Sequence, residues 1–265
     1  MFGGLEGLND SQFLGWFFLP ALQSLGMWMQ HFKLAESITN AMQIPHAKCN
    51  LGRLQCLSLN QSMANTTDMI WMLAQMNSLE QLRLGMQYAT SLEAWRSVGA
   101  IEPGLLHVAP TLRRLTLNPH FALIFHGAYE APPQQKAMKL THGILRTFPN
   151  LHTIRLPVSA LIGWGMAQED LAEALPLHIV DLVLRDCQID QYLPFRRLDE
   201  IHRQLTWFLL YQVQNFKRLR RITVFITCPY GDPFQPDRNL IRQLGRDKGV
   251  LVNLMHPNGR PLDRS

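Results

Sequence analysis

The chain has 265 residues, of which 47% are hydrophobic, and its formal net charge is +5 at pH 7. That apolar fraction is enough for a packed core, and we expect a single domain over residues 1–265. The four cysteines show neither a CxxC pair nor the spacing of a disulfide framework. The composition therefore argues against a disulfide-stapled secreted protein and favours a reducing compartment, the cytoplasm or the nucleus.

One short pattern recurs along the chain: L-x-x-L-x-L, with Ile, Val or Met allowed at the leucine positions. It predicts seven short strands, at Leu22-Leu25-Met27, Leu54-Leu57-Leu59, Leu79-Leu82-Leu84, Leu112-Leu115-Leu117, Leu151-Ile154-Leu156, Ile179-Leu182-Leu184 and Leu219-Ile222-Val224. An eighth, weaker strand is expected over residues 250–254. Successive patterns start 25 to 40 residues apart, which leaves room for one helix after each strand. This organisation resembles a leucine-rich repeat.

Helical spacing of apolar residues predicts the other half of several units, over residues 67–77, 134–148, 168–175, 198–216 and 239–247. Four strands are entered directly from a Pro or Asn, at Pro20, Asn77, Pro110 and Pro149-Asn150. Proline cannot continue a helix, and it fixes the turn into the strand. Several units exceed the standard repeat length, so we expect loops over 118–133, 157–165 and 229–236.

Together these elements predict an α/β fold, an irregular leucine-rich-repeat solenoid in which a curved parallel sheet is lined by helices on its convex side. About eight strand–helix units would run from residue 13 to residue 256. The alternative is a mixed α/β domain whose strands are leucine-rich by accident. Solenoids need polar caps, and the apolar stripe Phe13, Trp16 and Phe17 would lie at an open end. We therefore expect a longer native protein, or a partner that covers this end.

Residues 13–29 form an apolar stretch that could be mistaken for a membrane anchor. The stretch has 17 residues and contains Pro20, Gln23 and Ser24, whereas a spanning helix needs about 20 predominantly apolar residues. We read it as the end of a helix followed by the first strand, and we expect no membrane role.

The residues between the motif leucines predict the binding surface. With the motif numbered L1-x2-x3-L4-x5-L6-x7, positions x3, x5 and x7 point away from the core, towards the concave side of the solenoid. These positions hold five Arg and one Asp but no Lys or Glu, and two aromatic residues stand near the ends of the row. The candidate partner-binding residues are Trp28, Arg83, Arg114, Arg155, Arg185, Arg221 and Phe225.

A guanidinium group binds a carboxylate or a phosphate through two hydrogen bonds. We therefore expect a protein partner with an acidic or phosphorylated segment. The alternative is that the arginine stems cover the strand surface while their charged heads stay solvated.

Catalytic motifs do not stand out in the sequence. We find no G-x-S-x-G, G-x-G-x-x-G or P-loop pattern, and His46 with Cys49 forms an isolated H-x-x-C that is too little for zinc. We expect no enzyme activity, no cofactor and no metal. The basic run Lys217, Arg218 and Arg220 lacks interleaved aromatics. We therefore assign it to the C-terminus of the long helix and the turn that follows, where cations are favoured, rather than to nucleic-acid binding.

Residues 108–117 (VAPTLRRLTL) and 148–156 (FPNLHTIRL) resemble the repeat region of fungal F-box-type leucine-rich-repeat proteins. So does the ending, in which a helix at 241–244 runs into residues 248–252. The resemblance covers about residues 19–254 and rests on leucine spacing; an F-box motif is not found in this sequence. It implies substrate recognition for a cullin-type ubiquitin ligase. The alternative function is a stand-alone repeat scaffold without a ligase role.

Overall fold

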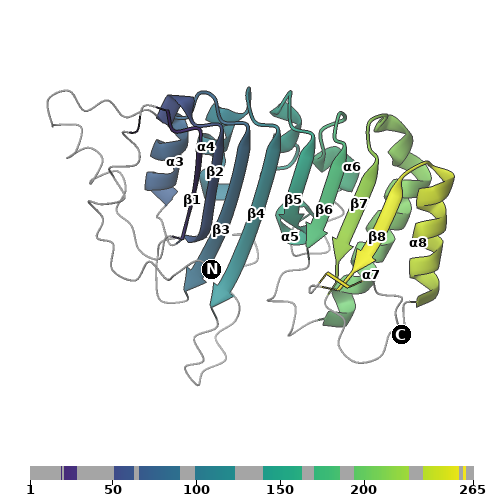
Figure 1. Ribbon diagram of the computed structural model, residues 1–265. Helices are drawn as coiled ribbons and strands as arrows, with labels where there is room; N and C mark the ends of the chain where they lie inside the picture. Colours follow the sequence, from purple (N-terminus) through teal and green to yellow (C-terminus); the bar gives the residue numbers. More distant parts are fainter. Residues whose placement is uncertain are drawn as a thin grey trace, which may run out of the picture.

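The structure, a computed structural model, describes residues 19, 21–28, 51–62, 66–89, 99–122, 140–162, 170–185, 194–226, 235–256 and 259–260. Within these ranges eight strands form one parallel sheet, in which the strands stand side by side in chain order (Figure 1). The strands are β1 (Ser24–Trp28), β2 (Cys56–Ser62), β3 (Gln81–Ala89), β4 (Arg114–Ala122), β5 (Thr153–Pro157), β6 (Asp181–Arg185), β7 (Arg221–Phe225) and β8 (Leu251–Met255). The seven strands predicted from the leucine pattern and the eighth, expected over residues 250–254, are therefore confirmed.

The described helices pack against one face of the sheet, behind the strands in Figure 1. The α-helices are α3 (Thr66–Ala74), α4 (Glu102–Val108), α5 (Val158–Ile162), α6 (Leu171–Ala174), α7 (Pro194–Trp207) and α8 (Gln235–Asp247). Shorter or irregular turns are the 3-10 helices η1 (Leu51–Arg53), η2 (Gly99–Ile101), η4 (Ile144–Thr147) and η7 (Val213–Asn215) and the π-helix η6 (Phe208–Gln212). Among the described residues, no helix is long and apolar enough to cross a membrane.

Several predicted boundaries are wrong. Residues 140–148 contain a turn and η4 instead of the end of an α-helix, and the long helix expected over 198–216 becomes α7, η6 and η7. Residues 134–139 lie outside the described residues. Helix α5 occupies part of the loop expected over 157–165, because a strand that ends in buried Pro157 passes directly into a helical turn. Strand β4 continues to Ala122, into the loop expected over 118–133.

Helix α4 was not among the predicted helices, because its first residues, Glu102, Pro103 and Gly104, look like a turn in the sequence. Proline is tolerated in the first helical turn, where its missing N–H would have had no intrahelical partner. At Gly104 an added Cβ would lie 3.0 Å from the Cα of Ile70 in α3. The glycine therefore permits close contact between the helices of two neighbouring units.

The strands begin in phase, and the same backbone contact marks each beginning. The carbonyl of Gln23 accepts hydrogen bonds from the N–H groups of Gln55 and Cys56, at 2.8 and 3.0 Å. The same two-donor arrangement recurs at the carbonyls of Gln55, Glu80, Arg113, His152 and Val180, which all occupy position x2. Equivalent motif positions are consequently paired across the sheet, as in Leu25 with Leu57 and Leu57 with Leu82.

The motif leucines form one continuous core beneath the sheet. At positions L4 and L6 of the seven patterns no side chain is more than 5% exposed, and most are completely buried. The residues between them lie on the opposite face, so β7 and β8 alternate strictly between exposed or half-exposed and buried residues. This alternation sends the x3 and x5 side chains away from the helices.

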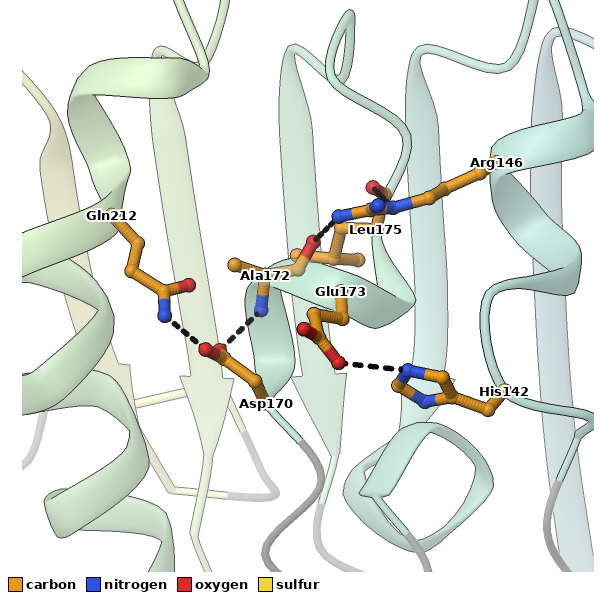
Figure 2. A network of polar contacts seen from close by, with 7 residues as sticks. All are labelled: His142, Arg146, Asp170, Ala172, Glu173, Leu175 and Gln212. Carbon is orange, nitrogen blue, oxygen red and sulfur yellow. Dashed lines mark hydrogen bonds and ion pairs between the residues drawn. The ribbon is translucent and has the colours of Figure 1, made fainter.

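Polar contacts on the helical side join successive units (Figure 2). Arg146, in η4, donates hydrogen bonds to the carbonyls of Ala172 at 2.7 Å and Leu175 at 3.3 Å, one unit further on. Asp170 accepts from the N–H of Ala172 at 2.9 Å, which caps α6, and it also accepts from the side-chain amide of Gln212 in the following unit. Three consecutive units are thus held in register by side chains as well as by the sheet.

Candidate binding surface

The sheet face that the described helices leave uncovered, here called the open face, carries the predicted candidate residues. All five candidate arginines are exposed: Arg83, Arg114, Arg155, Arg185 and Arg221. Phe225 lies on the same face and is half-buried. Trp28 belongs to β1, but its side chain lies outside what the structure describes.

The pairing register decides which of these side chains are neighbours. Arg83 is opposite Thr116, and Thr116 is opposite Arg155, so the two arginines flank a threonine in one row across β3, β4 and β5. Arg185 stands two residues further along β6 and is opposite Phe225 of β7. Strands lie about 4.8 Å apart in a sheet, so these long side chains share one electrostatic environment.

Arg83, Arg155 and Arg185 are called the arginine cluster below. Loss of hydration lowers the pKa of Arg185, and the positive charges of Arg155 and Arg83 lower it further. The guanidinium carbon of Arg185 lies 5.0 Å from the centroid of the Phe225 ring, a cation–π contact. Among the residues that the structure describes, no carboxylate forms an ion pair with any of the three. The cluster therefore concentrates positive charge that no described carboxylate neutralises.

Arg221 differs from the arginine cluster because its charge has a partner within the protein. Its Nε donates to Oδ1 of Asp181 at 3.0 Å, so its charge is already paired within the protein. The sequence contains a signal for this pair, because the two residues occupy position x3 in consecutive motifs and are opposite each other in the sheet. Arg114 lies in the same x3 row on β4, outside the arginine cluster.

Three positions that were predicted to point away from the core are buried. Val183 is 8% exposed although it does not belong to the core, and it lies between Arg155 and Thr223 in the sheet. The long side chains beside it explain its burial, since an arginine stem packs along apolar surface. Gly85 is buried where the pairing of β2 with β3 is irregular, and Pro157 is buried where β5 passes into α5.

The remaining candidate sites are only partly described. His46 and Cys49 lie outside the described residues, and within the described ranges no group of three His, Cys, Asp or Glu side chains could hold a metal ion. Lys217, Arg218 and Arg220 are exposed in the turn between η7 and β7. The predicted turn after the helix is confirmed for Lys217 and Arg218, and the helical segment itself ends before them, at Asn215.

In comparisons with known proteins, no family model matches the chain, and no curated protein matches it significantly. The class of this protein therefore has to be inferred from its own repeated geometry and from the charge of its open face.

Proposed function

We propose that this chain is a leucine-rich-repeat binding module whose open face takes an acidic or phosphorylated segment of a protein partner. One observation carries the proposal: the arginine cluster is exposed, and its charges repel one another without a neutralising carboxylate among the described residues. A bound oxyanion would relieve that repulsion and accept charge-assisted hydrogen bonds from the guanidinium groups. The common starting position of the strands and the pairing of equivalent motif positions across the sheet support the repeat class.

The cluster is more than a set of solvated arginines. Contact with Phe225 holds one planar face of the Arg185 guanidinium and restricts the motion of the side chain. Such a contact uses the π surface of the group, whereas its N–H donors lie in the plane and can still bind an anion. Restricting the side chain before binding reduces the entropy lost on association.

The spacing of the cluster indicates the size of the ligand. Arg83 on β3 and Arg185 on β6 are three strands apart, which corresponds to about 14 Å. An extended peptide covers that distance with about four to five residues. We expect a short segment that crosses the strands and carries two or three carboxylates or phosphates.

Peptide binding tests this proposal. The probes are a short phosphoserine- and glutamate-containing peptide and a serine- and glutamine-containing peptide of the same length, followed by fluorescence anisotropy. We expect only the acidic peptide to bind, and we expect the triple variant Arg83→Gln, Arg155→Gln, Arg185→Gln to weaken binding by at least tenfold, since one charge-assisted hydrogen bond alone contributes about that factor.

The matched control is the triple variant Lys217→Gln, Arg220→Gln, Lys248→Gln. It removes the same charge from exposed positions that lie off the open face. If both triple variants weaken binding equally, general attraction by net charge explains the affinity and the open face is not the site.

The resemblance of the repeats to those of F-box proteins favours a partner that is a ubiquitin-ligase substrate; the second candidate is a stand-alone scaffold. Affinity purification of the chain, with and without its natural upstream extension, separates the two. Co-purification of the ligase adaptor with the extended form alone supports substrate recognition. If the adaptor co-purifies with neither form, the scaffold is favoured.

A further inference from the structure

A second basic site lies at the edge of the sheet where β5, β6 and β7 begin. It is a shallow, open recess of about 220 Å³, called the edge recess below, and it is lined by Arg113, Pro149, Asn150, His152, His178 and Arg218. Three of these residues immediately precede the first leucine position of a motif: Asn150, His178 and Arg218. Two others immediately follow a first leucine position: Arg113 and His152. The recess is therefore built from equivalent positions of consecutive units.

The backbone contacts of the strand entries hold these side chains together. The N–H of His152 donates to the carbonyl of Arg113 at 3.0 Å, and the carbonyl of His152 accepts from Val180 at 2.8 Å. The side-chain amide of Asn150 donates to the carbonyl of Pro110 at 2.7 Å. The floor and rim of the recess are thus positioned by hydrogen bonds between neighbouring units.

The edge recess contains two guanidinium groups and two imidazoles, and none of its lining residues is acidic. Two described carboxylates lie near it, and each contacts an arginine. Glu80 makes a long, exposed contact of 3.7 Å with Arg113, and Asp181 pairs with Arg221. Positive charge at the recess is consequently only partly offset.

Each of the two histidines has one feature that favours an anion in the recess. Burial lowers the pKa of His152, Arg114, Arg113 and His178 lower it further, and Asp181 acts in the opposite direction. Nε2 of His178 is buried without a hydrogen-bond partner among the described residues, which is uncommon for a buried polar atom. An anion in the recess would offset the charge repulsion and provide an acceptor for a small rotation of the His178 ring.

We propose that the edge recess binds a single phosphate-type oxyanion, independently of the arginine cluster on the open face. Its volume accommodates one such group together with a few water molecules, since a water occupies about 30 Å³ of liquid. Arginine and protonated histidine side chains are the donors suited to phosphate oxygens. The phosphate is either a free inorganic ion or part of a phosphorylated side chain, and the two sources are separated by experiment.

Isothermal titration calorimetry of the full chain with inorganic phosphate, and with a short phosphoserine peptide, tests the proposal. We expect saturable binding, weakened about tenfold by Arg113→Gln or by Arg218→Gln, because each removes a charge-assisted contact. Both residues are exposed, so these variants test the site without altering the core. Arg220→Gln, an exposed change outside the recess, and Arg155→Gln, in the arginine cluster, should leave phosphate binding unchanged.

The two ligands are compared in the triple variant Arg83→Gln, Arg155→Gln, Arg185→Gln, which lacks the arginine cluster. There, equal affinities for phosphate and peptide indicate a site for the free ion, and tighter binding of the peptide indicates a phosphorylated segment. An absence of saturable binding, or equal weakening by Arg113→Gln and Arg220→Gln, overturns the proposal. Failure of the open face to bind peptides would leave this result untouched.

A pH series with sulfate, which keeps its double negative charge over this range, examines the histidines. We expect sulfate to bind more tightly at pH 5.5 than at pH 7.5. Burial, Arg114 and Arg113 lower the pKa of His152 while Asp181 opposes them, and a bound anion beside Arg113 and Arg218 would favour the protonated imidazole of His152. Replacing His152 by Gln should reduce this pH dependence. Sulfate affinity that does not change with pH would contradict participation of the His152 imidazole.

Discussion

Replacement of Arg155 by Gln should make the protein more stable, although it removes a residue from the proposed binding surface. Arg155 lies in the arginine cluster and its charge lowers the pKa of Arg185, so the protonated neighbours repel each other in the folded state. Two unit charges about 10 Å apart in a water-like dielectric repel by about 0.4 kcal/mol. Arg155 has two such neighbours, Arg83 and Arg185, and so we expect a gain of about 0.3–0.8 kcal/mol at low salt.

For a chain of this size that gain corresponds to an increase in Tm of about 1–3 °C. Differential scanning fluorimetry at low and at high ionic strength measures it, and the increase should shrink in 0.5 M salt because the Debye length becomes shorter than the separation of the charges. A polyanionic ligand should raise the Tm of the wild-type protein more than that of the variant.

Arg221→Gln provides the control, since Arg221 is also an exposed arginine of the open face but is paired with Asp181 at 3.0 Å. Loss of an exposed ion pair costs about 0.2–1 kcal/mol, so this variant should be less stable than the wild type. A decrease in Tm for both variants would refute the idea that the cluster is electrostatically strained. An increase for both would show that net charge, rather than local pairing, controls stability.

Three further changes test the packing between units and the edge recess. Gly245→Ala should destabilise the protein by about 1–2 kcal/mol in urea unfolding, because overpacking outweighs the gain in helix propensity. The new Cβ would lie 2.5 Å from Cγ2 of Val252 and 2.8 Å from the carbonyl oxygen of Val250. An unchanged midpoint would show that α8 can move away from β8. Arg146→Met should cost about 1–2 kcal/mol in the same assay, since it removes the hydrogen bonds to two carbonyls of the next unit; a smaller loss than for an exposed arginine elsewhere would argue against a role in stacking. Because the pKa of His152 is lowered on folding, stability should fall as the pH drops below about 6.5. His152→Gln should reduce that fall. A variant whose stability has the same pH profile as the wild type would contradict the assignment to His152.

Leucine spacing predicts the strands because burial of the fourth and sixth motif residues leaves little freedom in register: a shift of one residue would expose all of them. The helical side is less predictable. Its segments vary in length and include 3-10 and π turns as well as α-helices, and packing against neighbours overrides local propensity. The first turn of α4, with Pro103 and Gly104, illustrates this, since the glycine is explained by the position of α3 in the preceding unit.

The direction of the open-face arginines follows from strand alternation and could be predicted. Their partners could not be predicted without the register, which is why the pairing of Arg221 with Asp181 and the stacking of Arg185 on Phe225 emerge only in the structure. The edge recess is harder still to predict, because its residues come from positions outside the outward-facing rows and are up to 105 residues apart in the sequence, from Arg113 to Arg218.

The sequential order of the strands also determines how local unfolding would spread through the sheet. Each strand is hydrogen-bonded only to its neighbours in the sequence, so opening of either end of the sheet need not disturb units two or three strands away. The arginine cluster occupies β3, β5 and β6 and has at least two further strands on each side. We therefore expect hydrogen exchange to be slowest beneath the cluster and faster towards β1 and β8, so that terminal fraying, whether thermal or caused by proteolysis, would leave its geometry intact.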